Sequence, residues 1–469
     1  MIRNLFALIA SLARFLVEAI QFAFVLIIRK NNDHDLHAQF SNGEGLLSVF
    51  NQGFVVNGKH ALSLKNSTKH AVIIGGSGVG KSTCVFIPCL LSMHKSHGSF
   101  IIHDPSTELS KAGGVLHRQG FDLKILDFSN ASRSISFNPL QKIKDESDIN
   151  KIAAMLIKTT LGFKDPFWDN ASQSLLRMMI GLALKLEPPF QNFANVRQLI
   201  LMLNSNSKKI DALMAKHADA KLFNEYRAFI SQDVKVTKGI ISTCLASLQI
   251  FADENVAQVT SSDSLSFESL RTHKIALLIQ TKINGQQYYN VLISMFFELL
   301  FKSLMEELPQ KGSRNIFMLI DEAASGLRIP SLNNALANCR KYRISVILGL
   351  QDYRQLEETY SKEDAQTIMT NCFAKMYFTN QSHDTAKTLE GILGRYTYQE
   401  DNKKNIRNLM EASEIRMLPD NKAILLMGNH PPVLTTLYPY YKRWWLRRRI
   451  KAEMPVITHK KPQKLSYIE

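Results

Sequence analysis

The sequence predicts an α/β protein in which a mainly parallel sheet is interrupted by an all-α insert and preceded by a transmembrane helix. Three observations in the 469-residue chain support this prediction. Short apolar runs recur along the chain and are separated by helical patterns, which is typical of buried parallel strands. A long internal segment contains no such run and is rich in leucine and methionine at helical spacing. A further apolar run, long enough to cross a bilayer, opens the chain.

Residues 1–30 are predicted to form a membrane anchor. Residues 5–28 are a mostly apolar run of 24 residues, and a helix of that length would measure about 36 Å. No small-residue cleavage site follows, which favours a retained anchor over a removed signal peptide. Two opposite charges within the run indicate contact with a partner helix; the alternative is an amphipathic helix on the membrane surface. Arg29 and Lys30 follow, so we expect a single pass with the bulk of the chain in the cytoplasm.

The strand runs divide the rest of the chain into domains. They comprise residues 71–74, 100–104, 123–127, 275–280, 316–321, 345–351, 375–380 and 423–428. We therefore expect an α/β domain in two parts, residues 69–144 and 269–440, with the all-α insert at residues 145–268 between them. Residues 31–68 are polar and glycine-punctuated and are predicted to form a stalk, and residues 441–469 a basic C-terminal tail.

The stretch GGSGVGKST follows the first run and fits the phosphate-loop pattern G-x-x-x-x-G-K-[ST]. Its glycines allow backbone N–H groups to converge on phosphate oxygens beside the N-terminus of the next helix. Lys81 would neutralise the β- and γ-phosphates, and the Ser82 hydroxyl would ligate Mg²⁺. The predicted nucleotide-binding residues are Gly75, Gly76, Ser77, Gly78, Val79, Gly80, Lys81, Ser82 and Thr83.

A second half of an ATPase site is predicted at IFMLIDE, where an apolar run leads into Asp321 and Glu322. Asp321 would support the Mg²⁺ through water, and Glu322 would polarise the attacking water. Gln351 ends the run at residues 345–351 and is predicted to sense the γ-phosphate, the alternative being a simple strand cap. Together these residues imply ATP and Mg²⁺ as the cofactors of a P-loop ATPase.

Other nucleotide-binding classes find no support in the sequence. The guanine-reading N/T-K-x-D motif, the LSGGQ signature of ABC transporters and the H-R-D and D-F-G motifs of protein kinases are all missing. A RecA-like ring motor remains. In such a motor, the 240-residue separation between Lys81 and Asp321 is explained by the inserted helical domain.

Charge and cysteine usage narrow the partners and the compartment. The net charge of +16 favours a polyanionic partner, either nucleic acid or an anionic membrane face, over a merely solvated basic surface. From Lys442 onward nine Lys and Arg residues stand against two Glu, beside two tyrosines and two tryptophans. This tail suits nucleic acid and a membrane surface equally well. Five scattered cysteines indicate a reducing compartment without structural zinc.

Several separate stretches resemble one known family. They are GGSGVGKST, HDPSTEL at residues 103–109, SFNPL at 136–140, DPFWDNAS at 165–172, LIDEAASGLRIPSL at 319–332 and ANCRKYRISVILGLQDYRQLEETY at 337–360. In order and spacing, the chain resembles the coupling proteins of type IV secretion systems, the TraG/TraD-type conjugative DNA-transfer ATPases. The resemblance covers most of residues 70–395, and SFNPL and the Phe-Trp pair are its most specific parts.

The resemblance implies a motor at the bacterial inner membrane. Members of the family are thought to assemble as hexamers and to deliver a relaxase–DNA complex or effector proteins to the secretion channel, and we expect the DNA to be single-stranded. Arg340, 19 residues after Asp321, matches the arginine that members present to the neighbouring subunit's nucleotide. The alternative for Arg340 is an ordinary place in a basic helix end.

Two departures from the family pattern stand out. The acidic loop usually reads DPKGE, whereas here Ser106 and Thr107 replace its Lys and Gly. Many members carry two membrane helices, whereas this sequence predicts one. The main alternative function is a receptor that recruits protein effectors and uses ATP to gate the channel. A general DNA translocase of the cell-division type agrees poorly with SFNPL and the Phe-Trp pair.

Overall fold

The computed structural model describes residues 36–93, 96–161, 166–281, 286–401, 403–455 and 465–468. The predicted membrane anchor, residues 1–30, lies outside these ranges. Within them, no helix is both long enough and apolar enough to cross a membrane.

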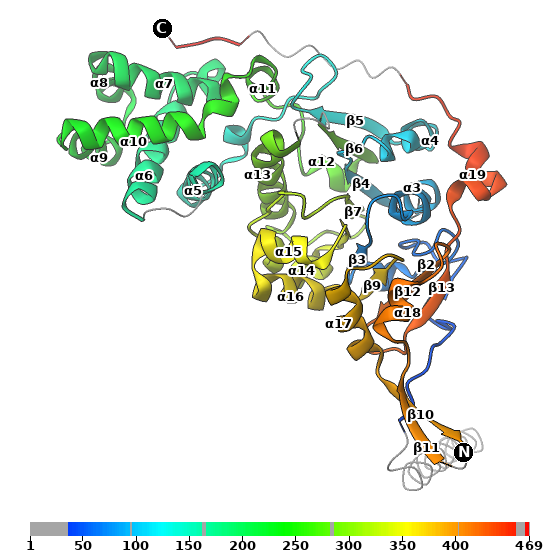
Figure 1. Cartoon of the computed structure of the whole chain (residues 1–469). Coiled ribbons are helices and arrows are strands. Elements are labelled where there is room, and N and C mark those ends of the chain that lie inside the picture. The colour runs from blue at the N-terminus through cyan, green and yellow to red at the C-terminus, as the bar shows by residue number, and fades with distance from the viewer. Residues whose placement is uncertain are drawn as a thin grey trace, which may run out of the picture.

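A nine-stranded sheet forms the centre of the molecule, in the order β13-β12-β9-β3-β8-β7-β4-β6-β5 (Figure 1). The strands from β9 to β5 are all parallel, and β12 and β13 add an antiparallel edge. Their bounds are β3 Ala71–Ile74, β4 Gly98–His103, β5 Asp122–Asp127, β6 Ile275–Gln280, β7 Asn315–Ile320, β8 Ile344–Leu350, β9 Ala374–Tyr377, β12 Lys422–Met427 and β13 Val433–Thr436. The prediction of an α/β fold on a mainly parallel sheet is confirmed.

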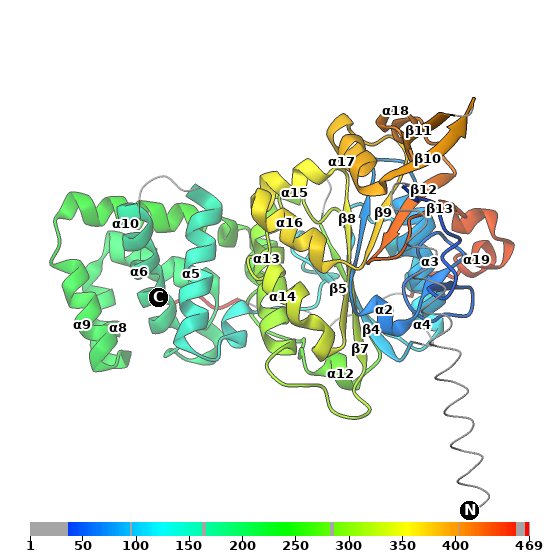
Figure 2. The same ribbon diagram turned by 90° about the horizontal axis from the view of Figure 1, so that it is seen from below.

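The sheet is buried on both faces, which explains why its strands are continuous apolar runs. In β3 every side chain is buried: Val72 and Ile74 pack into one core, and Ala71 and Ile73 into the other. Figure 2 shows one helical layer on each side of the sheet. One layer contains α13 Gln286–Leu304, α14 Leu332–Asn338, α15 Tyr353–Tyr360 and α16 Lys362–Asn371; the other contains α3 Ile87–Ser92, α4 Gly113–Arg118 and α19 Trp444–Arg449.

An all-helical lobe leaves the sheet after β5 and returns before β6, its neighbour (Figure 1). Its main helices are α5 Glu146–Leu161, α6 Pro166–Ala183, α7 Phe193–Ser205, α8 Ser207–His217, α9 Ala220–Ile230, α10 Val234–Ser247 and α11 Glu254–Val259, followed by the short α12 Ser269–Thr272. Trp168 of α6 packs directly on Gly239 of α10, where a Cβ would lie 2.7 Å from the indole. The Phe-Trp pair therefore lies at a close helix crossing.

The segments predicted as a stalk and as a basic tail contribute to the packed domain. Residues 46–67 form β1 Leu47–Ser48, β2 Ala61–Leu62 and α2 Leu64–Ser67, and the fully buried ring of Phe54 contacts Phe317 of β7. Arg449 of α19 donates to the Leu91 carbonyl of α3 at 3.0 Å. Residues 465–468 dock on the all-helical lobe, where the Asn195 side chain bonds the backbone of Ser466 and Ile468 at 2.9 and 3.0 Å.

The remaining elements lie beyond β9. They are α17 His383–Leu393, β10 Arg395–Glu400, β11 Lys403–Asn408 and α18 Ala412–Arg416. Strands β10 and β11 pair with each other as a hairpin, which projects from the α/β domain (Figure 1), and His37 forms an isolated bridge to Tyr396 of β10.

Candidate active site

The phosphate loop joins β3 to the helix that begins at Ser82. Gly78 and Gly80 have φ angles of 79° and 104°, in the left-handed region that glycine adopts without strain. At Gly75 a Cβ would come within 2.8 Å of Phe378 and Val79, so a larger residue is excluded there. The loop's path therefore depends on glycine for two separate reasons, conformation and close packing.

Lys81 lies at the mouth of this loop. Its ammonium group is largely buried and donates to the carbonyls of Gly75 and Gly76 at 2.6 and 3.0 Å. Burial lowers the pKa of Lys81, and the nearby carboxylates of Asp321 and Glu322 act against that shift. The structure thus places the predicted phosphate-binding cation beside the predicted acidic pair.

Asp321 follows β7 at the carboxyl edge of the sheet, next to β8. Burial raises the pKa of its carboxyl group to about 7, despite the opposing charge of Lys81. A Cβ on Gly349 would approach Asp321 Oδ1 to 2.8 Å, so the neighbouring strand leaves space for the carboxylate only because it carries glycine. His103 Nδ1 donates to the Asp321 carbonyl at 2.9 Å, and burial holds the pKa of His103 at about 4, which keeps the ring neutral.

Glu322 has a φ of 55°, an uncommon conformation for a residue with a side chain. Its N–H donates to Asp321 Oδ1 at 3.2 Å, and its Oε1 accepts from Gln351 Nε2 at 3.3 Å. The next residue is fixed by a bond from the Ala323 N–H to the Gly349 carbonyl, 2.8 Å long. Backbone strain of this kind persists where the surroundings enforce it, commonly at functional sites. Gln351 thus contacts Glu322, and its role as a sensor of the γ-phosphate stays a prediction.

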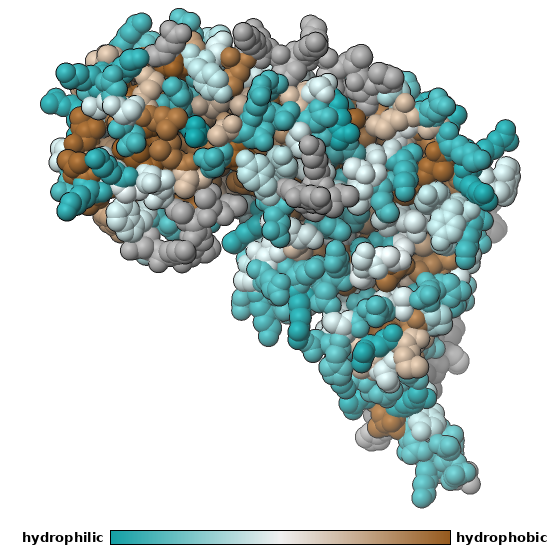
Figure 3. All heavy atoms as spheres, turned by 45° about the horizontal axis from the view of Figure 1, so that its top comes forward, coloured by the Kyte–Doolittle hydropathy of each residue, from teal (hydrophilic) through white to brown (hydrophobic). Residues whose placement is uncertain are grey.

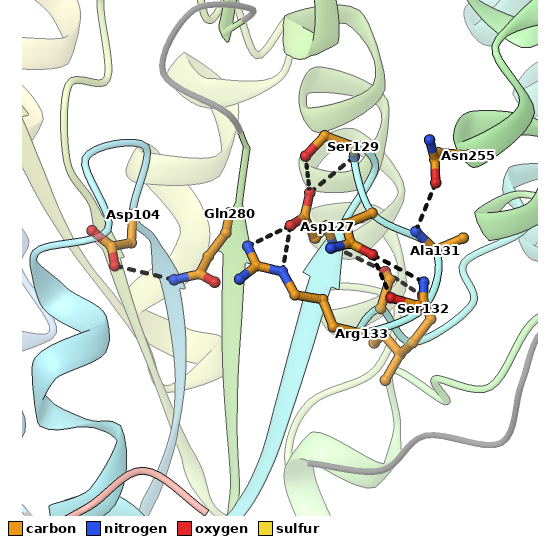
Figure 4. A network of polar contacts seen from close by, with 11 residues as sticks. Asp104, Asp127, Ser129, Ala131, Ser132, Arg133, Asn255 and Gln280 are labelled. Atoms are coloured by element: carbon orange, nitrogen blue, oxygen red, sulfur yellow. Dashed lines mark hydrogen bonds and ion pairs between the residues drawn. The ribbon is translucent and has the colours of Figure 1, made fainter. Parts of the chain in front are cut away.

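The acidic loop DPSTE, residues 104–108, forms another part of the site. Asp104 accepts from the N–H groups of Leu109 and Ser110 at 3.1 and 2.8 Å, and from Gln280 Nε2 at 3.5 Å (Figure 4). Burial raises the pKa of Asp104, and these donors act against the shift. Asp104 therefore holds the loop, while Ser106 and Glu108 line the cleft.

Hydrogen bonds near the end of β5 connect the carboxyl edge of the sheet to the all-helical lobe. In Figure 4, Arg133 points toward Asp127 at the end of β5; its Nε lies 2.7 Å from the carboxylate. Ser129 donates to the same carboxylate through its N–H and its hydroxyl group. Asn255 of α11 accepts from the Ala131 N–H at 3.2 Å. The lobe thus contacts the loop that follows β5.

A cleft of about 960 Å³ contains the phosphate loop and the acidic pair. Ser82 and Asp321, the predicted Mg²⁺ residues, both line it, as do Glu322 and seven further loop residues, Gly76, Ser77, Gly78, Val79, Gly80, Lys81 and Thr83. A further set of residues that line the cleft was not predicted from the sequence. They are Thr379, Asn380, Arg416, Asp420, Asn421, Leu437, Pro439, Tyr441 and Lys442. None of these belongs to a nucleotide motif. The only signal was the aromatic and basic composition around Tyr441.

Arg340 lies away from this cleft. It is exposed in the turn Cys339–Tyr342, which precedes β8, whereas Gln351 follows β8. The two residues therefore occupy opposite edges of the sheet. Arg340 lines a different cavity, of about 1000 Å³, together with Lys69 and Arg354. Its role toward the nucleotide of a neighbouring subunit stays a prediction.

Fold and site together define a P-loop α/β protein with an inserted helical lobe. A model of the family described as "Type IV secretory system Conjugative DNA transfer" matches residues 25–467. The chain belongs to this family.

Relatives of the chain carry related names. It is 21% identical over 410 residues to the protein VirD4 of Agrobacterium fabrum, covering 82% of this chain and 60% of VirD4. It is 21% identical over 386 residues to the coupling protein TraD of Escherichia coli, covering 77% of this chain and 52% of TraD. The chain thus spans between about half and three fifths of the length of these relatives. The plasmid coupling protein TrwB, solved with ADP and Mg²⁺, shares the fold with a TM-score of 0.66 and 19% identity, covering 82% of this chain and 88% of TrwB.

Proposed function

We propose that this chain is a membrane-anchored ATPase that couples ATP hydrolysis to the delivery of DNA, as a relaxase–DNA complex, into a type IV secretion channel during conjugation. The observation that carries the proposal is the meeting of Lys81, Asp321 and Glu322 in one cleft of a chain from the conjugative DNA-transfer family. The complex of TrwB with ADP and Mg²⁺ supports ATP as the substrate.

The residues of the cleft fit ATP with Mg²⁺. A Cβ on Gly76 or Gly78 would meet no atom within 4 Å, so the loop's backbone is open toward the cleft. Burial raises the pKa of Asp321 to about 7 by disfavouring its ionised form, and the positive charge of Lys81 offsets only part of this shift, so additional positive charge would favour the ionised form. A divalent cation held by Ser82 and Asp321 would supply that charge and neutralise the phosphates.

The residues of the chain then divide the work of hydrolysis. Lys81 donates to two carbonyls of the loop in this structure. With a nucleotide bound it would donate to phosphate oxygens instead, because these oxygens also carry negative charge and lie within its reach. Glu322 would orient the attacking water and accept its proton. Gln351 would hold the Glu322 carboxylate in place through the contact at 3.3 Å.

The remaining parts of the proposal concern assembly and location. We propose a homo-hexamer at the bacterial inner membrane, anchored by a single pass of residues 5–28, with the bulk of the chain in the cytoplasm. In such a ring Arg340 would stabilise charge on the γ-phosphate bound by the neighbouring subunit. Its exposure, at the sheet edge opposite its own cleft, suits a role in trans rather than in cis.

The test is ATP turnover of the full chain in detergent, measured against protein concentration with and without single-stranded or double-stranded DNA. Lys81→Ala provides the blank. We expect turnover per chain to rise steeply with concentration and with DNA. Arg340→Ala should remove the rise, whereas Lys341→Ala, the adjacent exposed lysine, should leave it intact. ATP turnover that does not change when DNA is added would overturn the DNA-delivery proposal and favour a receptor that recruits effector proteins.

A further inference from the structure

Residues 36–38 bond to the free edge of the hairpin β10–β11. The Leu36 N–H donates to Thr397 Oγ1 and the Thr397 N–H to the Leu36 carbonyl, each at 2.9 Å, and the Ala38 N–H donates to the Arg395 carbonyl at 3.1 Å. His37 bridges to Tyr396 in antiparallel register. Residues 36–38 are therefore fixed to β10 at the part of the molecule that projects beyond the α/β domain (Figures 1 and 3).

The register divides the side chains of this ribbon between two faces. Thr397 is paired with Ile406, Gln399 with Lys404 and Arg395 with Asn408, and directly paired residues lie on one face. Leu36 lies on the same face, opposite Thr397. We call this set the aliphatic face: Leu36, Arg395, Thr397, Gln399, Lys404, Ile406 and Asn408. It combines two basic side chains with no acidic one.

The opposite face differs in carrying an acidic side chain as well as basic ones. It carries Glu400 with Lys403, and Tyr396 with Arg407. Arg407 is paired with Glu414 at 2.7 Å, and Tyr396 packs against Tyr398 with ring centroids 5.9 Å apart. The aliphatic face also has polar partners at one end, where Arg395 Nε donates to Asn408 Oδ1 at 3.2 Å and Asn408 Nδ2 donates to Glu390 and Glu411.

The aliphatic face exposes apolar surface without a covering element in the described chain. Leu36 is 43% exposed and Ile406 60% exposed. A thin ribbon gains little from its own packing, so exposed aliphatic side chains at its centre indicate a contact made elsewhere.

The position of Leu36 in the chain limits its distance from the predicted membrane-spanning run. Leu36 is eight residues after Ile28, the end of the predicted membrane-spanning run. Eight residues span at most about 29 Å when fully extended. If residues 5–28 cross the bilayer, as the proposed function has it, the ribbon lies within that distance of the cytoplasmic lipid surface.

We propose that the aliphatic face of the β10–β11 ribbon binds the headgroup region of an anionic bilayer. Leu36 and Ile406 enter the boundary between headgroups and acyl chains, and Arg395 and Lys404 contact anionic headgroups. The inference rests on the membrane anchor of the proposed function but concerns different residues. Its consequence is that the α/β domain has a second lipid contact besides the anchor, which fixes its orientation on the membrane.

The chain is well suited to a site-specific probe, because all five native cysteines are buried. In Ile406→Cys, an environment-sensitive fluorophore on the new thiol reports the polarity at the aliphatic face. The labelled full chain is reconstituted in vesicles of phosphatidylcholine with or without phosphatidylglycerol. Quenching by lipids that carry a nitroxide is then measured. Val234→Cys is the matched control, because Val234 is 66% exposed and lies in the all-helical lobe.

We expect blue-shifted emission and strong lipid quenching at position 406 and neither at position 234. Lys404→Glu should reduce the quenching in phosphatidylglycerol vesicles, whereas Lys403→Glu, on the opposite face, should change it little. Vesicles that float with the chain while the probe at 406 stays unquenched would overturn the lipid contact alone. Blue-shifted emission without lipid quenching would also overturn it, in favour of a protein partner. A chain that does not float with vesicles would overturn the anchor and the ribbon contact together.

Discussion

At the residue scale, Thr107 and Glu322 adopt the left-handed region, with φ angles of 59° and 55°, as does Asn380 of the cleft at 59°. Thr107 and Glu322 flank the cleft at the carboxyl edge of the sheet. Thr107 occupies the place where the family motif DPKGE carries glycine, and its left-handed conformation explains why glycine suits that place. The structure thus shows which backbone conformation this position requires, which the sequence alone did not show.

Thr107→Gly should stabilise the protein. A β-branched residue in the left-handed region costs about 1–2 kcal/mol, and the greater freedom of glycine in the unfolded chain offsets roughly half of that. Thr107 is exposed, so few contacts are lost. A higher melting temperature in thermal unfolding would bear this out. Thr107→Ala keeps the Cβ and should give no gain; equal gains from both variants would argue against backbone strain.

Glu322→Gln should separate binding from hydrolysis. Removing a positioned general base lowers turnover by about 10²- to 10⁴-fold, whereas nucleotide affinity should change little because Lys81 and the loop remain. Turnover and equilibrium ATP binding measured side by side would check this. Gln351→Ala, which only frees the Glu322 carboxylate, should give a smaller loss. An unchanged rate in Glu322→Gln would exclude Glu322 as the base.

The motif residues of the site could be predicted because each depends on a short local pattern. Lys81 follows a glycine loop, and Asp321 with Glu322 ends an apolar run. Tyr441 and Arg416 could not be predicted, because they reach the cleft from segments with no fixed spacing to either motif.

At the element scale, the short turn Tyr440–Lys442 brings the segment after β13 to the phosphate loop. Tyr441 and Lys442 line the cleft together with the phosphate loop, and Tyr441 is the one aromatic residue among the described residues that line it, so we expect the base of a nucleotide to stack on it. The segment predicted as a basic tail thus contributes to the candidate active site.

Tyr441→Ala should weaken nucleotide binding. Stacking of a base on an aromatic ring is worth about 1–3 kcal/mol, so the KM for ATP should rise roughly tenfold or more with little change in kcat. Trp444→Ala is the control, since Trp444 is 75% exposed and does not line the cleft. Equal effects of the two variants on KM would exclude a base contact at Tyr441.

His70, at the start of β3, should make stability depend on pH. Its Nδ1 accepts from the Val346 N–H at 3.1 Å, and burial lowers the pKa of His70 from 6.5 to about 4. Below pH 6.5 the His70 side chain binds a proton in the unfolded chain but not in the folded chain, until the pH approaches 4. The stabilisation is therefore complete above pH 6.5 and is lost as the pH falls toward 4, by about 2 kcal/mol at pH 5.

The measurement for His70 is the melting temperature of the wild-type chain and of His70→Gln, between about pH 7.5 and pH 5. We expect the advantage of the wild type to shrink on acidification. Because His103 titrates in the same direction in both proteins, it cancels in the difference. A constant difference across this range would mean that His70 does not lose its proton on burial.

The eight predicted runs all became strands, seven of them parallel, because a parallel sheet covered on both faces demands continuous apolar sequence; the eighth, β12, is buried in the same way but pairs antiparallel with both of its neighbours. The hairpin β10–β11 was missed for the opposite reason. RYTYQE and KKNIRN are polar and exposed, so no burial pattern marks them. Strand β13 was missed because it is a four-residue antiparallel edge.

At the scale of the whole molecule, residues 465–468 connect the far end of the chain to the all-helical lobe. Asn195, fully buried, donates to the Ser466 carbonyl and accepts from the Ile468 N–H. Ile468 itself is 8% exposed and joins the core. No sequence pattern pairs residues this far apart, so this contact was beyond sequence-based prediction.

Asn195→Leu should release this C-terminal contact, because it leaves one backbone donor and one acceptor without partners at a cost of about 1–3 kcal/mol. Hydrogen exchange of the Ile468 amide should accelerate. Asn338→Leu serves as the control, since the Asn338 side chain bonds only to Asn334 of its own helix. Unchanged exchange at Ile468 would mean that its own burial, rather than Asn195, holds the segment.

The strand order described above also has a consequence for biosynthesis. β3, at residues 71–74, lies between β8 and β9, which begin at residues 344 and 374. A ribosome adds about 5–20 residues per second, so β3 waits roughly 15 to 50 s for its first neighbour. The all-helical lobe emerges whole during that interval and can fold locally. The nascent chain therefore carries an unpaired apolar strand through most of its synthesis, which makes it a natural client for chaperones that bind extended apolar segments.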